Sequence, residues 1–252
     1  MVMSLNFKEW PTPNQDERPD DPQKIDILVL HYTGMVSAKA ALERMRDPVF
    51  KVSTHWCIDE DGTIYRLVPE EMRAWHAGLS YWRQRHLVND TSIGIELVNP
   101  GHEFGYRPFP PPQMDALIYL ASNILARYGI RAANVVGHSD TAPLRKQDPG
   151  ELFDWARLAR NGIGIWPRAT MEPKFEPVAL DLGASGSEVL QLQKNLFEFG
   201  YGLSCDGYFG TESHAIVRAF QRHFRQARVD GIADGATRAI LDNLLDQERD
   251  EA

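Results

Sequence analysis

Apolar positions in the first 165 residues follow two different spacings, which predicts a domain that mixes strands and helices. Residues 25–30 (IDILVL) form a mostly apolar run that is typical of a buried strand. Residues 92–98 (SIGIELV) alternate, so that positions 93, 95 and 97 share one face and Glu96 lies on the other. Residues 38–46 and 113–128 show helical spacing, and Gly129 is suited to end the second helix. We therefore predict a central sheet flanked by helices.

Shorter elements complete this domain. Residues 54–58 and 63–67 flank an Asp61-Gly62 pair, which is a hairpin signal. Residues 134–137 are predicted to form a strand that ends just before His138, and residues 154–162 a last helix. Residues 8–24 are rich in Pro, Asp, Asn and Gln, and we predict an irregular arm there.

A second, smaller domain is predicted after a linker. Residues 167–178 hold three prolines among few apolar residues. Amphipathic helices are predicted beyond it at 187–199, 211–223 and 234–245. The predicted boundaries are an arm at 1–24, an α/β domain at 25–166, a linker at 167–178 and an all-α domain of three helices at 179–252.

Composition narrows the function classes. The chain has 252 residues, of which 43% are hydrophobic and 25% charged, with a net charge of −8. This is an ordinary globular composition, and the absence of a dense Lys/Arg cluster argues against nucleic-acid binding. Cys57 and Cys205 lie far apart in the sequence and are predicted to be separate thiols.

Targeting signals are also informative. No apolar run approaches the roughly 18 residues needed to span a bilayer. The first 24 residues lack a basic segment followed by an apolar core, so a cytoplasmic location is expected for the sequence as written. The alternative is the cell envelope, reached by another route or with a signal already removed.

Two histidines and one aspartate are candidates for a metal site. His31 and His138 each follow a predicted strand, where the sheet holds a side chain and loops leave it open. Pro149 favours an extended Asp148, so that Lys146 and Asp148 project to the same side. Two histidines and a carboxylate with an open fourth position form a catalytic zinc arrangement. Each residue alone also fits a structural explanation, and their long-range spacing does not decide between the two.

Seven motifs in order make the chain resemble the zinc-dependent N-acetylmuramoyl-L-alanine amidases, which are related to phage T7 lysozyme and the peptidoglycan recognition proteins. Their order is more specific than any single motif. The resemblance covers roughly residues 20–167 and is carried by residues 31–33 (HYT), 53–56 (STHW), 61–65 (DGTIY), 74–78 (AWHAG), 89–96 (NDTSIGIE), 137–140 (GHSD) and 145–150 (RKQDPG).

The resemblance implies a mixed β-sheet and a zinc ion on His31, His138 and Asp148. It implies that Glu96 and Lys146 serve the reaction, and elementary chemistry agrees. A carboxylate such as Glu96 can take a proton from water and pass it to the leaving amine. A cation such as Lys146, together with zinc, can stabilise an oxyanion. The expected substrate bond joins the lactyl group of N-acetylmuramic acid to L-alanine.

Substrate contacts are less specified by the sequence. His76 and Trp75 lie in a motif that borders the cleft in the family, and we treat them as candidate substrate contacts. For His55 two roles fit equally well: it supports the metal ligands through a contact behind them, or it is purely structural. No role is predicted for four further histidines, namely His86, His102, His214 and His223.

The C-terminal region resembles small helical peptidoglycan-binding domains over roughly residues 178–246. The resemblance is carried by residues 182–186 (LGASG), 189–193 (VLQLQ), 199–201 (FGY), 206–210 (DGYFG), 219–221 (AFQ) and 230–231 (DG). Such a module would raise the local concentration of polymeric substrate. The expected partner is therefore peptidoglycan or its muropeptide fragments.

Two alternatives stay open at this stage. The first is a non-catalytic peptidoglycan-recognition protein on the same fold, against which the presence of Asp148 argues. The second concerns the substrate of an enzyme: soluble (1,6-anhydro)muropeptides, which fit the missing signal, or polymeric wall, which fits the C-terminal module.

Overall fold

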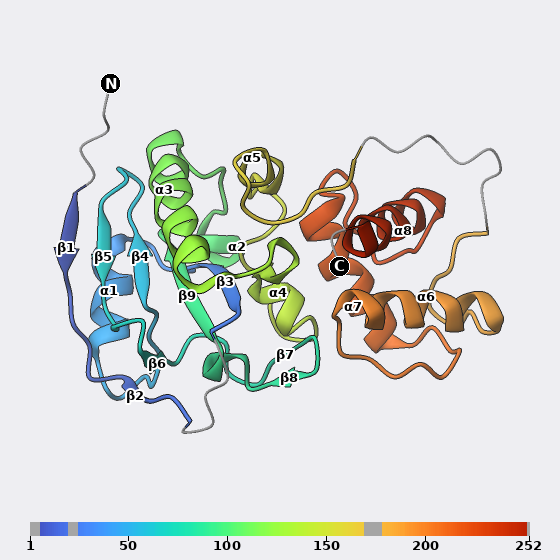
Figure 1. Cartoon of the computed structure of the whole chain (residues 1–252), viewed down its shortest axis with the longest axis horizontal. Helices are drawn as coiled ribbons and strands as arrows, with labels where there is room; N and C mark the ends of the chain where they lie inside the picture. Colours follow the sequence, from blue (N-terminus) through green and yellow to red (C-terminus); the bar gives the residue numbers. More distant parts are fainter. Residues whose placement is uncertain (1–5, 20–24, 169–177, 251–252) are drawn as a thin grey trace.

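The computed structural model describes residues 6–19, 25–168 and 178–250. Figure 1 shows an α/β domain built from the first two segments, and a bundle of helices built from the third. The predicted linker at 167–178 lies largely outside the described residues. Among the described residues, no helix is both long enough and apolar enough to cross a bilayer.

A six-stranded mixed sheet is the centre of the first domain. Its strand order is β1-β5-β4-β9-β3-β10, and the β4–β5 hairpin is the antiparallel pair within it. The strands are β1 (Phe7–Glu9), β3 (Ile27–Tyr32), β4 (Trp56–Ile58), β5 (Ile64–Arg66), β9 (Ser92–Leu97) and β10 (Val135–Gly137). The predicted fold class, a mixed sheet flanked by helices followed by a helical domain, is confirmed.

The N-terminal segment is not irregular as predicted. Strand β1 pairs in parallel with β5 at the edge of the sheet, and β2 (Gln15–Glu17) pairs with β6 (Met72–Ala74). The side chains of β1 are exposed and make only surface contacts, such as the ion pair of Glu9 with Arg66, so the strand shows no alternation of apolar residues to detect. In β2, Asp16 forms an ion pair with Arg73 at 2.6 Å.

Helices cover both faces of the sheet. Helix α3 (Pro111–Tyr128) packs against Leu28, Leu30 and the apolar face of β9, and α5 (Trp155–Arg160) joins the same cluster. Helix α1 (Ala38–Arg46) covers part of the opposite face. Helix α3 begins two residues earlier than predicted because proline is compatible with the first helical turn. Four shorter helices complete the domain, namely η1 (Val88–Asp90), α2 (Gly101–Phe104), η2 (Ala132–Asn134) and α4 (His138–Thr141).

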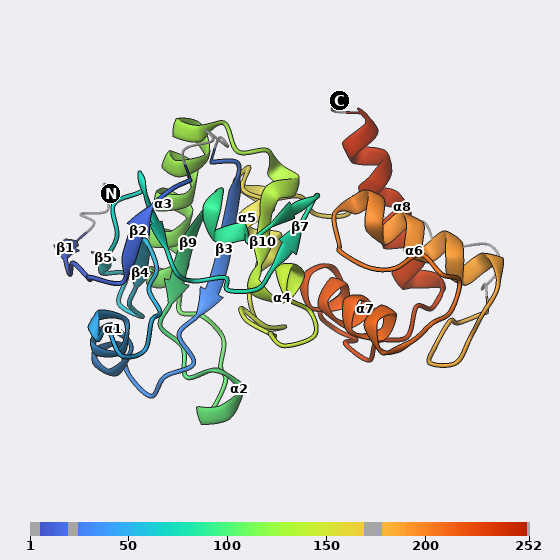
Figure 2. The same cartoon turned by 90° about the horizontal axis from the view of Figure 1, so that it is seen from below.

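The C-terminal domain has the three predicted helices, α6 (Ser187–Phe199), α7 (Thr211–Phe224) and α8 (Gly235–Asp250). It is docked on the first domain through one shared hydrophobic cluster. Trp82, from the small β7 (Tyr81–Trp82) and β8 (Arg85–His86) hairpin, packs edge-on against Phe199 and Tyr201 with ring centroids 6.1 and 5.1 Å apart. Figure 2 shows α7 beside α4, and the two helices are in contact. Cys57 and Cys205 are both free thiols, as predicted.

Candidate metal centre and catalytic cleft

Two neighbouring parallel strands bring two histidines together. His31 is the fifth residue of β3, and His138 follows the last residue of β10. In the register of this pair Gly137 lies opposite Leu30, so the two histidines emerge at the same edge of the sheet. Asp148 comes from the loop after α4, and its carbonyl oxygen accepts a hydrogen bond from the Ser139 amide at 2.9 Å.

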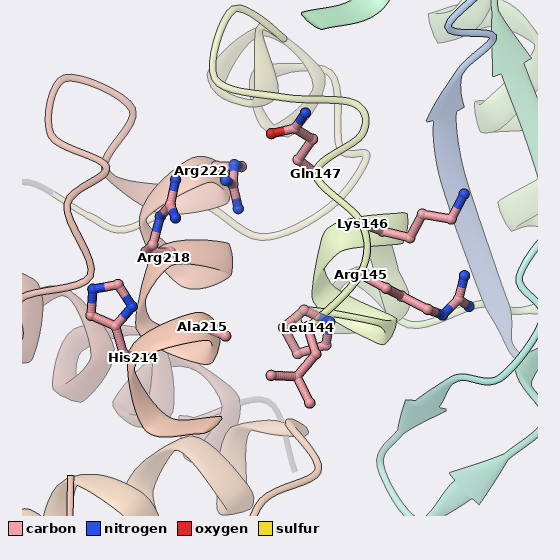
Figure 3. Close-up of a pocket in the computed structure, with 9 residues that line it drawn as sticks. Leu144, Arg145, Lys146, Gln147, His214, Ala215, Arg218 and Arg222 are labelled. Carbon is pink, nitrogen blue, oxygen red and sulfur yellow. The ribbon is translucent and has the colours of Figure 1, made fainter. Parts of the chain in front are cut away.

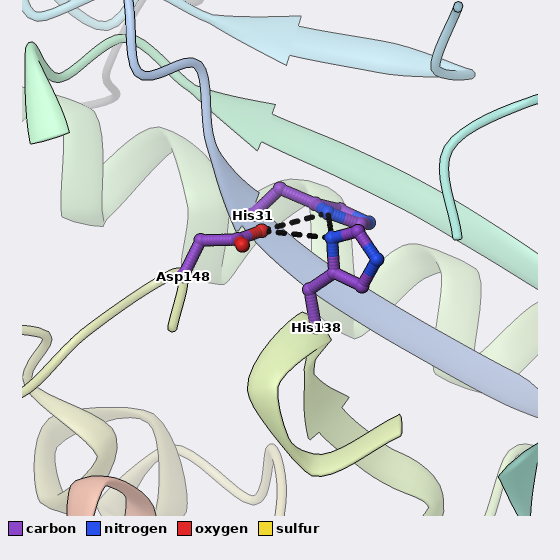
Figure 4. A group of neighbouring side chains, drawn as sticks. All are labelled: His31, His138 and Asp148. Carbon is purple, nitrogen blue, oxygen red and sulfur yellow. Dashed lines mark hydrogen bonds and ion pairs between the residues drawn. The ribbon is translucent and has the colours of Figure 1, made fainter. Parts of the chain in front are cut away.

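The three side chains converge on one point (Figure 4). The Nδ1 atoms of His31 and His138 are 3.0 Å apart, and each lies 3.1 Å from Oδ2 of Asp148. All three residues are buried. Among the described residues this is the one group of three potential metal ligands whose donor atoms lie so close together. The structure therefore brings together all three residues that the sequence predicted as ligands.

Contacts behind the cluster orient the two histidine rings. His138 Nε2 lies 3.1 Å from the carbonyl oxygen of Ala77, to which only a protonated nitrogen can donate. Its Nδ1 therefore presents a lone pair to the cluster. Burial and the proximity of His138 lower the pKa of His31 to about 4, which keeps that ring neutral at pH 7. Burial disfavours ionised Asp148, but the contacts with His138 and His31 outweigh it and hold the pKa of the carboxyl well below its ordinary value.

When both rings are neutral and their Nδ1 atoms are unprotonated, they and the carboxylate present three electron-pair donors to one buried space, which a cation between them would stabilise. Neutral imidazole and carboxylate are the ligand types that suit a divalent transition metal. The hydrogen bond from His138 to a backbone carbonyl is the kind of outer contact that orients metal-binding histidines. His31, His138 and Asp148 are thus able to hold a metal ion.

A cleft of about 640 Å³ opens onto this cluster. His138 and Asp148 line it, together with Glu96 from β9 and Lys146 from the loop after α4. Lys146 and Asp148 share the cleft, as the sequence predicted. Glu96 stands opposite His31 in the pairing of β9 with β3.

Glu96 is a buried carboxyl group that faces the cleft. Its Oε2 is buried and has no hydrogen-bond partner among the described residues. Burial raises the pKa of this carboxyl to about 8, with the nearby charge of Asp148 acting in the same direction and Lys146 opposing it. A carboxyl group with a pKa near 7 or 8 can accept and return a proton at neutral pH.

His76 lies at the wall of the cleft and behind the cluster. Its Nδ1 is 3.0 Å from Nε2 of His31, and its Nε2 is 3.2 Å from Oγ of Ser92. The ring is 6% exposed and fits only because position 94 is glycine, since a Cβ atom there would lie 2.5 Å from the ring. The structure places His76 where it orients His31.

His55 and Trp75 do not line the cleft. His55 is fully buried, its Nδ1 accepts a hydrogen bond from the amide of Gly94, and its Nε2 lies 3.1 Å from the carbonyl oxygen of Met72. The indole of Trp75 donates to Asp16 at 3.0 Å. His55 thus holds the strand that carries Glu96, and Trp75 anchors the segment that carries His76.

Sequence reasoning missed a second buried cluster on the other side of α4. Asp140 accepts hydrogen bonds from the Gly137 amide at 2.7 Å, from the Tyr201 hydroxyl at 2.7 Å and from His223 Nδ1 at 2.8 Å. His223 is stacked on Trp155 with ring centroids 3.7 Å apart. Tyr201 and His223 belong to the C-terminal domain, so this cluster fastens that domain to the segment that presents His138. The one available signal was the position of His223 on the apolar face of its helix.

Comparison with known proteins identifies relatives of both domains. A family model described as N-acetylmuramoyl-L-alanine amidase matches residues 21–151, and a model described as a peptidoglycan binding domain matches residues 185–241. N-acetylmuramoyl-L-alanine amidase AmiD of Escherichia coli K12 is 39% identical over 236 residues, which cover 89% of this chain and 83% of AmiD.

Solved structures agree with these matches. E. coli AmiD in complex with the substrate anhydro-N-acetylmuramic acid-L-Ala-D-gamma-Glu-L-Lys aligns with a TM-score of 0.75 and 37% identity, covering 88% of this chain and 89% of AmiD. AmpDh3 from Pseudomonas aeruginosa, in complex with an anhydromuramic pentapeptide, aligns with a TM-score of 0.76 and 33% identity. That alignment covers 92% of this chain and 96% of AmpDh3.

Proposed function

The chain belongs to the family of N-acetylmuramoyl-L-alanine amidases, and we propose that it uses a zinc ion held by His31, His138 and Asp148 to hydrolyse muropeptides. The bond cleaved joins the lactyl group of N-acetylmuramic acid to L-alanine of the stem peptide. One observation carries the proposal: three metal-binding atoms converge within 3.1 Å of one another in a cleft that also contains Glu96 and Lys146.

Zinc fits the observed cluster. Zinc binds histidine nitrogens and carboxylate oxygens at about 2.0–2.2 Å in tetrahedral geometry, which separates neighbouring ligand atoms by about 3.3 Å. The separations of 3.0–3.1 Å between the three donor atoms are close to that value. Three protein ligands leave the fourth position for water or substrate, as in catalytic rather than structural zinc sites.

The residues of the cleft divide the chemistry between them. A zinc ion held by His31, His138 and Asp148 would act as a Lewis acid and would lower the pKa of a bound water to about 7. We propose that Glu96, through its unpartnered Oε2, takes a proton from the attacking water and returns it to the amine of L-alanine as that amine leaves. Lys146 supplies a positive charge for the oxygen of the scissile carbonyl as it becomes negative.

The positioning residues act through hydrogen bonds. His76 holds His31, and the carbonyl oxygen of Ala77 holds His138, so that both Nδ1 atoms face Asp148. We further propose that residues 25–166 form the catalytic domain and residues 179–252 a peptidoglycan-binding domain. The second domain is docked beside the first rather than only tethered to it, because the Asp140 cluster and Trp82 join the two.

The proposal is tested with the full chain, anhydro-N-acetylmuramic acid-L-Ala-D-γ-Glu-L-Lys and purified sacculi. We expect one equivalent of zinc by elemental analysis. We also expect release of intact peptide and sugar, whose masses add up to that of the substrate plus one water. A chelator should abolish release and zinc should restore it. Hydrolysis that persists without bound metal, or a protein that binds muropeptide and never cleaves it, would contradict the proposal.

The same assay separates the two substrate pools. A preference for the soluble muropeptide would fit the predicted cytoplasmic location, and a preference for sacculi would fit the envelope. Fractionation of cells followed by the assay then measures where the activity resides.

A further inference from the structure

A cavity of about 310 Å³ lies between the two domains, next to the catalytic cleft. One wall is the loop after α4, including Lys146 and Gln147. The opposite wall is α7, which contributes His214, Arg218 and Arg222 to the lining (Figure 3). Neither domain forms this cavity alone, so it exists only because the domains are docked.

Arg222 is a buried cation that has no counter-ion among the described residues. It is 7% exposed, and its Nε has no hydrogen-bond partner among the described residues. Burial of a charge without a partner is unfavourable, and proteins normally pair such groups. Two other arginines of the same domain, Arg225 and Arg228, do form ion pairs with Asp234, at 2.6 and 3.0 Å.

A second arginine adds to the charge instead of neutralising it. Arg218 lies one helical turn before Arg222, on the same cavity wall. Like charges four residues apart on a helix destabilise each other. Burial and the neighbouring Arg218 both lower the pKa of Arg222. This arrangement would be relieved by an anion bound between the two guanidinium groups.

The nearest carboxylates are engaged elsewhere. Glu151 and Asp140 act on Arg222 through space, but neither forms an ion pair with it in the described part of the chain. Glu151 faces His102 at 3.3 Å, and Asp140 is occupied by Tyr201 and His223. The protein therefore does not supply the missing anion from its own described side chains.

The cavity is separated from the catalytic cleft by a single wall. Arg145, Lys146 and Gln147 line both spaces. Figure 3 shows the Gln147 amide on the side of Arg222, whereas the ammonium group of Lys146 points away from α7. A substrate whose scissile amide lies beside Asp148 can therefore continue over Gln147 towards the two arginines.

We propose that Arg222 and Arg218 bind a free carboxylate of the stem peptide of the substrate. This inference rests on the proposed function, because it extends the same cleft. A peptide such as L-Ala-D-γ-Glu-L-Lys has two candidates, since the γ-linkage leaves the α-carboxylate of glutamate free and the last residue carries another. Guanidinium groups bind carboxylates through paired, charge-assisted hydrogen bonds, which suits this site.

The test compares Arg222→Met with the wild-type holoenzyme on two substrates. One is the acidic muropeptide, and the other is the same compound with its free carboxylates converted to amides. We expect amidation to raise KM of the wild type at least 10-fold. Arg222→Met should raise KM for the acidic substrate by a similar factor, leave KM for the amide almost unchanged, and act on KM rather than on kcat.

Controls separate binding from structure. Arg249→Met removes an exposed arginine of the same domain and should change neither KM nor the melting temperature. Arg222→Met should keep or raise the melting temperature, because it removes an unpaired buried charge. Arg222→Lys should recover part of the affinity. A lower melting temperature together with equal effects on both substrates would show that Arg222 is structural and would overturn the proposal.

A binding measurement keeps this inference separate from the activity. Calorimetric titration of the zinc-loaded protein uses L-Ala-D-γ-Glu-L-Lys and its fully amidated form as probes. We expect tighter binding of the acidic tripeptide, with the difference lost in Arg222→Met. Equal binding of the two forms would refute the inference even if hydrolysis were normal. Absence of hydrolysis with selective tripeptide binding would instead refute the proposed function.

Discussion

Two buried clusters of histidine and carboxylate lie on either side of the short helix α4. On one side His138 meets His31 and Asp148, and on the other Asp140 meets His223 of the C-terminal domain. Both clusters are built from the same residue types and are almost completely buried. They differ in the groups that face the carboxylate oxygens of Asp148 and Asp140.

In the Asp140 cluster every carboxylate oxygen has a donor. One oxygen accepts from Tyr201, and the other accepts from His223 and from the amide of Gly137. Around Asp148, in contrast, the facing atoms are the Nδ1 atoms of two histidines, which are able to share a cation with the carboxylate. The Asp140 cluster joins the two domains, whereas the Asp148 cluster is suited to hold a metal ion. Histidine and aspartate therefore serve as metal ligands in one cluster and as a contact between domains in the other, and the groups that face them decide which.

Removal of a metal ligand should have the largest effect. Asp148→Ala should bind little zinc and lose about three or more orders of magnitude in kcat/KM, because the low pKa of water at the site depends on the metal. Zinc content and muropeptide hydrolysis measure this. Asp140→Asn is the matched control on the other side of α4 and should retain zinc. Full zinc occupancy in Asp148→Ala would remove that residue from the ligand set.

Glu96→Gln should have the next largest effect. The amide keeps the shape of the side chain but cannot shuttle a proton, so kcat should fall by about 10²–10⁴ while zinc content stays at the wild-type level. Glu103→Gln changes another carboxylate that lines the cleft and should leave kcat nearly unchanged. Similar kcat values for both variants would exclude Glu96 from proton transfer.

A substitution in the Asp140 cluster should lower the free energy of unfolding and leave the catalytic rate nearly unchanged. Tyr201→Phe keeps the ring packed on Trp82 but leaves an oxygen of Asp140 without its donor. The free energy of unfolding should fall by about 1–3 kcal/mol, the cost of a buried unsatisfied polar group. Denaturant unfolding measures the loss. Tyr208→Phe, at a residue that is 54% exposed, is the control and should be neutral. A neutral Tyr201→Phe would show that the Asp140 cluster adds little to docking.

A peripheral contact between the domains should have the smallest effect. Gln247 is buried and donates to the carbonyl oxygen of Trp166 at 3.2 Å. Gln247→Ala should reduce the free energy of unfolding by about 0.5–1.5 kcal/mol, the usual net worth of one hydrogen bond. Gln191→Ala, at an exposed glutamine of α6, should change it by less than about 0.5 kcal/mol. A larger loss for Gln247→Ala than for Tyr201→Phe would reverse the order of these contacts.

Regular elements with strong periodicity were predictable. Helices α1 and α6 have the bounds that their apolar spacing predicts, and β9 places Glu96 on the face opposite Ile93 and Ile95. The edge strand β1 was not predictable, because its exposed side chains carry no pattern and its pairing depends on main-chain groups of β5. Apolar periodicity arises in elements that bury one face. It therefore does not reveal a strand whose side chains stay exposed.

The sequence by itself predicted the central strands and the long helices in their order, a division into two domains and the residues that the metal proposal uses. Only the tertiary structure decided that His31, His138 and Asp148 point at one another while Asp140 turns to the second domain. It also placed Arg222 in a cavity beside the cleft. The physical reason is that burial and hydrogen-bond partners come from residues distant in sequence: strand pairing within the first domain brings the metal ligands together, and packing of the two domains forms the Asp140 cluster and the cavity of Arg222.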